Sequence, residues 1–98
     1  CSGFTQLVFR FKGIQLNRDA SQQVHQGEVI SYDRLKTNDV VFFENAKGKV
    51  THVGIYLGNN QIIHAHGQVR IDTLTLDGIL NTDTKEISHD FHGIRRMD

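Results

Sequence analysis

The sequence contains no proline, no tryptophan and only one cysteine among its 98 residues. A single cysteine excludes an internal disulfide bond and a zinc site built mainly from thiolates. Because proline is absent, the turns have to be formed by glycine, asparagine and aspartate. No apolar run approaches the ~20 residues that a membrane-spanning helix needs, so we expect no stable insertion into a membrane.

The sequence also has no excess of either charge. Eleven Lys and Arg residues balance eleven Asp and Glu residues, and no block of like charge occurs. A nucleic-acid-binding surface needs a cluster of basic residues, so we expect no nucleic acid as a partner. The length suits one domain over residues 1–98 and leaves the oligomeric state open.

The apolar pattern predicts helices in the first part of the chain and strands in the rest. Helical spacing of apolar residues predicts a helix over 2–12, and capping residues predict a second, short helix over 19–26. Residues 32–36 fit one irregular turn, and residues 77–90 fit a loop or a weak helix. β-rich runs between turn residues predict strands at 39–43, 50–58, 61–66, 68–74 and 91–97. We therefore expect an α+β domain, with N-terminal helices packed on an antiparallel β-sheet of about five strands.

Cys1 is placed at the start of the first predicted helix. Unpaired backbone N–H groups and the helix dipole at that position favour a thiolate, which is the nucleophilic form of cysteine. The same N–H groups could stabilise an oxyanion during acyl transfer. Two other interpretations remain open on the residues alone. Cys1 could be an inert core cysteine, or the lipid-carrying first residue of a processed bacterial lipoprotein.

Three histidines, His52, His64 and His66, share one face of the sheet if residues 58–60 form a three-residue loop. His52 alternates with Gly54 along strand 50–58, and this glycine is expected to leave space for a ring. A three-residue loop at 58–60 would place Gly54 opposite His64 and His52 opposite His66, whereas a two-residue loop would send both to the other face. A nucleophilic thiol needs a base within reach and a third group that orients the base. Cys1, His52 and either His64 or His66 could supply these groups.

A metal site is the competing interpretation of the same histidines. His52, His64 and His66 could bind zinc from one face, with Cys1 or water as the fourth ligand. The other three histidines show no partner pattern and are expected to be solvated; they are His25, His89 and His92.

Five segments of the sequence occur in an order that resembles one known family. They are CSGFTQLVFRFKGIQL, RDASQQ, LKTNDVVFF, HVGIYLGNNQIIHA and the closing GIRRM. Together they resemble the NlpC family of bacterial cell-wall cysteine endopeptidases, whose catalytic core is papain-like. The most specific parts are CSGF opening a helix and HVGIYLG on a strand, followed by IHA. The resemblance covers essentially the whole chain and implies a papain-like NlpC fold.

The resemblance also implies a role for individual residues. Cys1 matches the family's nucleophile, His52 its general base, and His64, rather than His66, the residue that orients the base. Ser21 lies in a segment that corresponds to a substrate-side loop. Family members cleave stem peptides of peptidoglycan, often between D-glutamate and the diamino acid. The resemblance therefore implies this substrate, a Cys-His-His triad with no metal or cofactor, and a periplasmic, extracellular or cell-envelope location in a bacterium.

The sequence departs from the family pattern at its start and in one turn. The family's aspartate before the nucleophile and its upstream helix and loop are not in this sequence, so we expect a catalytic domain that lacks that segment. Thr37-Asn38-Asp39 replaces the usual Pro-Gly-Asp turn, and asparagine tolerates the same turn conformation. The alternative function is a catalytically silent domain of the same fold that binds or organises the cell wall.

Overall fold

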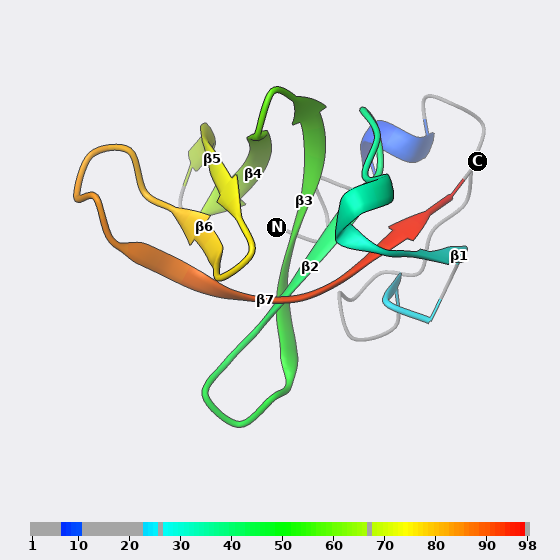
Figure 1. Ribbon diagram of the computed structural model, residues 1–98, viewed down its shortest axis with the longest axis horizontal. Helices are drawn as coiled ribbons and strands as arrows, with labels where there is room; N and C mark the ends of the chain where they lie inside the picture. Colours follow the sequence, from blue (N-terminus) through cyan, green and yellow to red (C-terminus); the bar gives the residue numbers. More distant parts are fainter. Residues whose placement is uncertain (1–6, 11–22, 26, 67, 98) are drawn as a thin grey trace.

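The computed structural model describes residues 7–10, 23–25, 27–66 and 68–97 (Figure 1). Residues 7–10 are helical, within the first helix that the sequence predicts. The other residues of that helix, and most of the second predicted helix, lie outside the described residues, so the packing of helices on the sheet stays a prediction. Among the described residues, no helix has the length and apolar character that crossing a bilayer requires.

The described chain is dominated by seven strands and one 3-10 helix, η1 (Tyr32–Arg34). The strands are β1 (Glu28–Ile30), β2 (Val40–Glu44), β3 (Val50–Gly58), β4 (Gln61–His66), β5 (Gln68–Thr75), β6 (Gly78–Leu80) and β7 (Ile87–Arg96). The prediction of about five strands is therefore wrong. The strands β1 and β6 have only three residues each, which is too short for an alternating pattern to stand out. Residues 77–90 contain β6 and the start of β7 instead of a loop or weak helix.

The seven strands form one antiparallel sheet that closes on itself. Their order is β1-β7-β2-β3-β4-β5-β6, and β6 also pairs with β7. Six strands, β2 to β7, therefore form a closed ring. β1 lies outside this ring and pairs with the C-terminal end of β7. Figure 1 shows β7 running from β6 at one side of the molecule to β1 at the other. Because the ring is closed, each of its six strands has a hydrogen-bonded neighbour on both sides.

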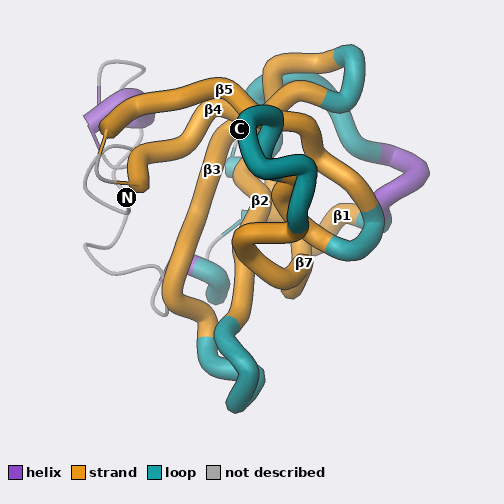
Figure 2. The backbone as a smooth tube through the Cα atoms, turned by 90° about the vertical axis from the view of Figure 1, so that its left-hand side faces the viewer, coloured by secondary structure: helices purple, strands orange, loops and turns teal. Residues whose placement is uncertain are grey.

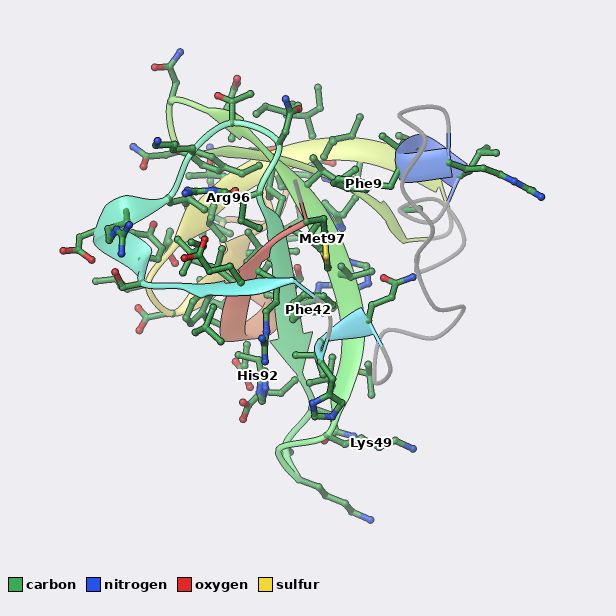
Figure 3. The ribbon with its side chains drawn as sticks, turned by 90° about the vertical axis from the view of Figure 1, so that its right-hand side faces the viewer. Phe9, Phe42, Lys49, His92, Arg96 and Met97 are labelled. Atoms are coloured by element: carbon green, nitrogen blue, oxygen red, sulfur yellow. The ribbon has the colours of Figure 1, made fainter. Side chains whose placement is uncertain are left out.

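The sheet buries both of its faces, which explains the unbroken apolar run VVFF in β2. The inner cluster, inside the closed sheet, consists of Ile30, Val41, Phe43, Ile62, Leu74, Ile79 and Ile94. The outer cluster lies on the opposite face and consists of Phe9, Val40, Phe42, Val50, Val53 and Ile55. Figure 3 labels Phe9 and Phe42, which belong to the outer cluster. The helical residues 7–10 thus cover part of the outer face.

The β3–β4 hairpin has the predicted register but a different turn. Gly54 lies opposite His64, as expected. However, the turn has two residues, Asn59 and Asn60, both with positive φ, and Gly58 pairs with Gln61. A bulge between Tyr56 and Gly58 adds the extra residue, which restores the side-chain alternation that a two-residue turn would have reversed. The turn of the β2–β3 hairpin projects away from the sheet at the opposite end of β3 (Figure 2).

Two positions limit which residue can occupy them, one by its backbone angle and one by the space around it. Asn38 has φ of 78°, so the expected tolerance of asparagine in the Thr37-Asn38-Asp39 turn is confirmed. Gly54 gives its space to Ile62, because a Cβ there would lie 2.7 Å from the Ile62 Cδ1 atom. The expectation that Gly54 makes room for a histidine ring is therefore wrong.

Gly78 is expected to be the least replaceable glycine of the closed sheet. Its φ is 142°, and a Cβ there would overlap the carbonyl oxygen of His89 on β7. We expect Gly78→Ala to lower the free energy of unfolding by about 1–3 kcal/mol, because β6 and β7 must separate. Urea unfolding followed by circular dichroism measures this. Gly93→Ala on β7 is the control, since nothing lies within 4 Å of a Cβ there. Equal losses in the two variants would contradict this account of closure.

Candidate active site

The centre of the candidate site is a pair of buried histidines on neighbouring strands. His52 is on β3 and His64 on β4, with exposed fractions of 4% and 1%. The His52 Nε2 atom lies 2.8 Å from the His64 Nδ1 atom, and the two rings are perpendicular. The register that pairs Gly54 with His64 places both rings on the inner face of the sheet. The predicted contact between these two histidines is therefore present.

Asp72 on β5 continues this chain of contacts on the far side of His64. The His64 Nε2 atom lies 2.7 Å from the Asp72 Oδ2 atom, and Asp72 is 2% exposed. Arg70 donates to both carboxylate oxygens, from Nε at 2.7 Å and from Nη2 at 3.0 Å. Thr82 donates to the Oδ1 atom from both its backbone N–H and its hydroxyl group. The carboxylate thus accepts hydrogen bonds from three residues.

These hydrogen bonds decide the charge of Asp72. Burial alone would raise the pKa of its carboxyl group, but hydrogen bonds from Arg70, His64 and Thr82 outweigh burial and hold the pKa well below its usual range. The same partnership raises the pKa of the Arg70 guanidinium. Asp72 is therefore an anion at neutral pH, and it is balanced by a cation within hydrogen-bond distance.

A third histidine, His89 on β7, packs against the face of the His52 ring. The two ring centroids are 3.9 Å apart with an angle of 18° between the planes. His89 is partly buried, so the prediction that it is solvated is wrong; His25 and His92 are exposed, as predicted. The register of each strand shifts one residue before the stacked histidine, at Thr51 and at Ser88. Such bulges re-aim side chains and leave no clear pattern in a sequence, which explains why the stack could not be predicted.

The structure covers part of the site that the sequence predicts. Cys1 and Ser21 lie outside the described residues, as does the side chain of His66, so their places in the site stay predictions. Asp72, Arg70 and His89 were not predicted. The alternation Arg70-Ile71-Asp72 on the strand after His64 was the available signal, because residues two apart share a face of a strand.

The described residues do not favour the zinc interpretation of the histidines. Both ring nitrogens of His64 are engaged, one with His52 and one with Asp72. Within the described ranges, which include neither Cys1 nor the side chain of His66, no group of three or more histidine, cysteine, aspartate or glutamate side chains has an arrangement that could hold a metal ion. The arrangement instead suits proton transfer, because it holds one imidazole in place through a second imidazole and an anion.

Comparison with known proteins places this geometry in a family context. A murein DD-endopeptidase/murein LD-carboxypeptidase of Escherichia coli K12, MepS, is 46% identical over 66 residues, covering 66% of this chain and 35% of that protein. A gamma-D-glutamyl-L-lysine dipeptidyl-peptidase of Bacillus subtilis is 37% identical over 67 residues, covering 66% of this chain and 23% of that protein. The chain thus spans between 23% and 35% of the length of these two curated relatives.

A solved structure and a family model cover more of the chain. The crystal structure of an NlpC/P60 family protein from Bacillus cereus superposes with a TM-score of 0.81 and 29% identity, covering 99% of this chain and 31% of that one. The family model described as NlpC/P60 matches residues 1–89, which include both buried histidines and Asp72. The fold and the match over most of its length show that the chain belongs to the NlpC/P60 family.

Proposed function

We propose that this domain is a cysteine endopeptidase that hydrolyses peptide bonds in peptidoglycan stem peptides, of the D-glutamyl–diamino acid type. The hydrogen bond between the buried His52 and His64 carries the proposal, because it is the base-and-orienter pair that a thiol nucleophile requires. The names of the two relatives, which refer to murein and to a γ-D-glutamyl-L-lysine bond, support this class of substrate. The same names support a location in the bacterial cell envelope.

The proposed reaction proceeds through a covalent acyl-enzyme. His52 accepts the proton of the Cys1 thiol, and the thiolate attacks the scissile carbonyl carbon. The tetrahedral intermediate collapses to a thioester when His52 passes this proton to the leaving amine. Water then gives a proton to His52 and attacks the thioester, and return of that proton to sulfur releases the carboxylic acid. His64 orients His52 throughout, and Ser21 is proposed to contact the substrate.

The pH dependence of Cys1 alkylation tests the pairing of Cys1 with His52. We expect the wild-type thiol to react with iodoacetamide with an apparent pKa below about 7, because an adjacent imidazolium stabilises the thiolate. In His52→Ala the apparent pKa should move toward the ordinary value of about 8.5. Mass spectrometry of the labelled protein across pH 5–10 measures both. His92→Ala is the matched control, since His92 is exposed and its hydrogen-bond partner is Glu44, not His52 or His64.

The same experiment separates the proposal from its alternatives. A catalytically silent wall-binding domain predicts that wild type and His52→Ala titrate alike near 8.5. A zinc hydrolase predicts that activity is lost with a chelator and is indifferent to alkylation. A wild-type shift that His52→Ala abolishes and His92→Ala retains would support the cysteine peptidase.

A further inference from the structure

We infer that Asp72 is a positioning residue of the site, which fixes through His64 the proton arrangement that puts a lone pair on the His52 Nδ1 atom, the atom that acts as the base. The inference rests on the proposed function for its catalytic meaning. The contacts that carry it are the two consecutive hydrogen bonds from His52 to His64 and from His64 to Asp72.

The proton between Asp72 and His64 belongs to His64. An ionised carboxylate can only accept hydrogen bonds. The Asp72 carboxylate is ionised, since hydrogen bonds from Arg70 and Thr82 also converge on it. At 2.7 Å, the His64 Nε2 atom must therefore carry the hydrogen and donate it to Oδ2. The tautomer of His64 is set by the carboxylate behind it.

The proton between the two histidines belongs to His52. His64 is 1% exposed, and Arg70 already balances the charge of Asp72, so a second buried cation would be costly and His64 is neutral. A neutral imidazole with a hydrogen on Nε2 has a lone pair on Nδ1. This lone pair accepts at 2.8 Å, so the His52 Nε2 atom carries the hydrogen. The His52 Nδ1 atom then has the lone pair and can take a proton from a thiol.

The surroundings of Asp72 show why an amide could not replace it. The Oδ1 atom faces three donor groups, and two of them, the Thr82 backbone N–H and the Arg70 Nη2 atom, can never accept. The Oδ2 atom faces the Arg70 Nε atom and the His64 ring, and only the ring can change from donor to acceptor. An amide NH₂ at this position would therefore turn toward His64. It would reverse the tautomer of His64 and, through it, that of His52.

The experiment measures the histidine tautomers directly, by ¹⁵N NMR of the imidazole nitrogens in wild type and Asp72→Asn. For these spectra every protein carries Cys1→Ala and the pH is held at 9, so that no thiol proton reaches His52 and both rings are neutral. In the otherwise wild-type protein we then expect protonated Nε2 and unprotonated Nδ1 on both His52 and His64. In Asp72→Asn we expect the two assignments to exchange. With Cys1 retained, Asp72→Asn should lower kcat/KM on muropeptide by about 10²–10⁴-fold.

Asp39→Asn is the matched control variant. Asp39 is also 2% exposed and also accepts two hydrogen bonds from one arginine, Arg96, but it contacts neither histidine. The control should lose a comparable amount of stability while its histidine tautomers stay as in the wild type. A change of tautomer that appears only in Asp72→Asn cannot come from the loss of a buried ion pair alone.

The outcomes separate this inference from the proposed function. A protonated Nδ1 on His52 in the wild type overturns the inference even if Asp72→Asn fails to fold, and identical tautomers in wild type and a folded Asp72→Asn overturn it as well. Exchange of the tautomers in Asp72→Asn alone supports it. The expected tautomers in a wild type that shows no hydrolysis would support the proton arrangement and reject the peptidase.

Discussion

Replacing His52 with alanine is expected to lower kcat/KM for a peptidoglycan stem peptide by about 10³–10⁴-fold. His52 is the proposed acceptor of the thiol proton and the donor to the leaving amine, so its loss affects both steps of the reaction. Its ring is held by His64 at 2.8 Å and by the stacked ring of His89, which leaves little freedom to reorient. Steady-state hydrolysis of purified muropeptides, followed by chromatography, measures the loss.

Two further variants make this loss interpretable. His64→Ala should lower kcat/KM less, by about 10–100-fold, because His64 orients the base without touching the reacting atoms. His25→Ala should keep wild-type activity, since the His25 side chain is exposed. An active His52→Ala protein, or a larger loss in His64→Ala than in His52→Ala, would contradict the assigned roles.

Replacing Asp72 with alanine is expected to lower the free energy of unfolding by about 3–5 kcal/mol. The change removes the acceptor for Arg70, His64 and Thr82 in a place that is 2% exposed. Since small domains are stable by only about 5–15 kcal/mol, this loss would remove a large part of the free energy of unfolding. Urea unfolding at pH 7 measures it.

Asp83→Ala is the control, because Asp83 accepts a hydrogen bond from the same Arg70 Nη2 atom but its side chain is 78% exposed. Asp83→Ala should lower the free energy of unfolding by less than about 1 kcal/mol. Equal losses in Asp72→Ala and Asp83→Ala would contradict the importance of burial.

The contribution of Asp72 should also depend on pH in a defined direction. Its pKa is lower in the folded protein than in the unfolded chain, so the unfolded state binds the proton first. The stability that Asp72 contributes is therefore complete above the unfolded pKa of about 4 and is lost as the pH falls below it. The difference in the free energy of unfolding between wild type and Asp72→Ala should accordingly become smaller when urea unfolding is repeated between pH 5 and pH 2.

The local pattern of the sequence was sufficient for the β2–β3–β4 part of the fold. Alternation and turn residues predicted these strands and the pairing of Gly54 with His64. The prediction held although the turn is shorter than expected, because a bulge compensates for the missing residue. The contact between His52 and His64 could be anticipated for the same reason. It depends on one hairpin, whose register is set by nearby residues.

The rest of the site depends on contacts that no short segment encodes. His89 reaches His52 only because β6 and β7 close the sheet, and Gly78 allows that approach. A three-residue strand such as β6 can be identified from the strands that it pairs with, but not from its own sequence. Asp72 could have been placed on the face of His64 by counting along the predicted strand. Its ionisation, however, depends on Thr82 in the turn between β6 and β7.

The pairing of β7 with β1, β2 and β6 has a consequence for how the protein folds. β7 is the last of these seven strands to be synthesised, and one of its hydrogen bonds, from Arg95 to Gly27, spans 68 positions of the chain. Contacts between such distant segments slow folding, and until β7 docks, β2 and β6 each keep an unpaired edge. The step that removes these edges also brings His89 onto His52. A chain in which β7 has not docked would therefore be both prone to aggregation and without the stack of His89 on His52.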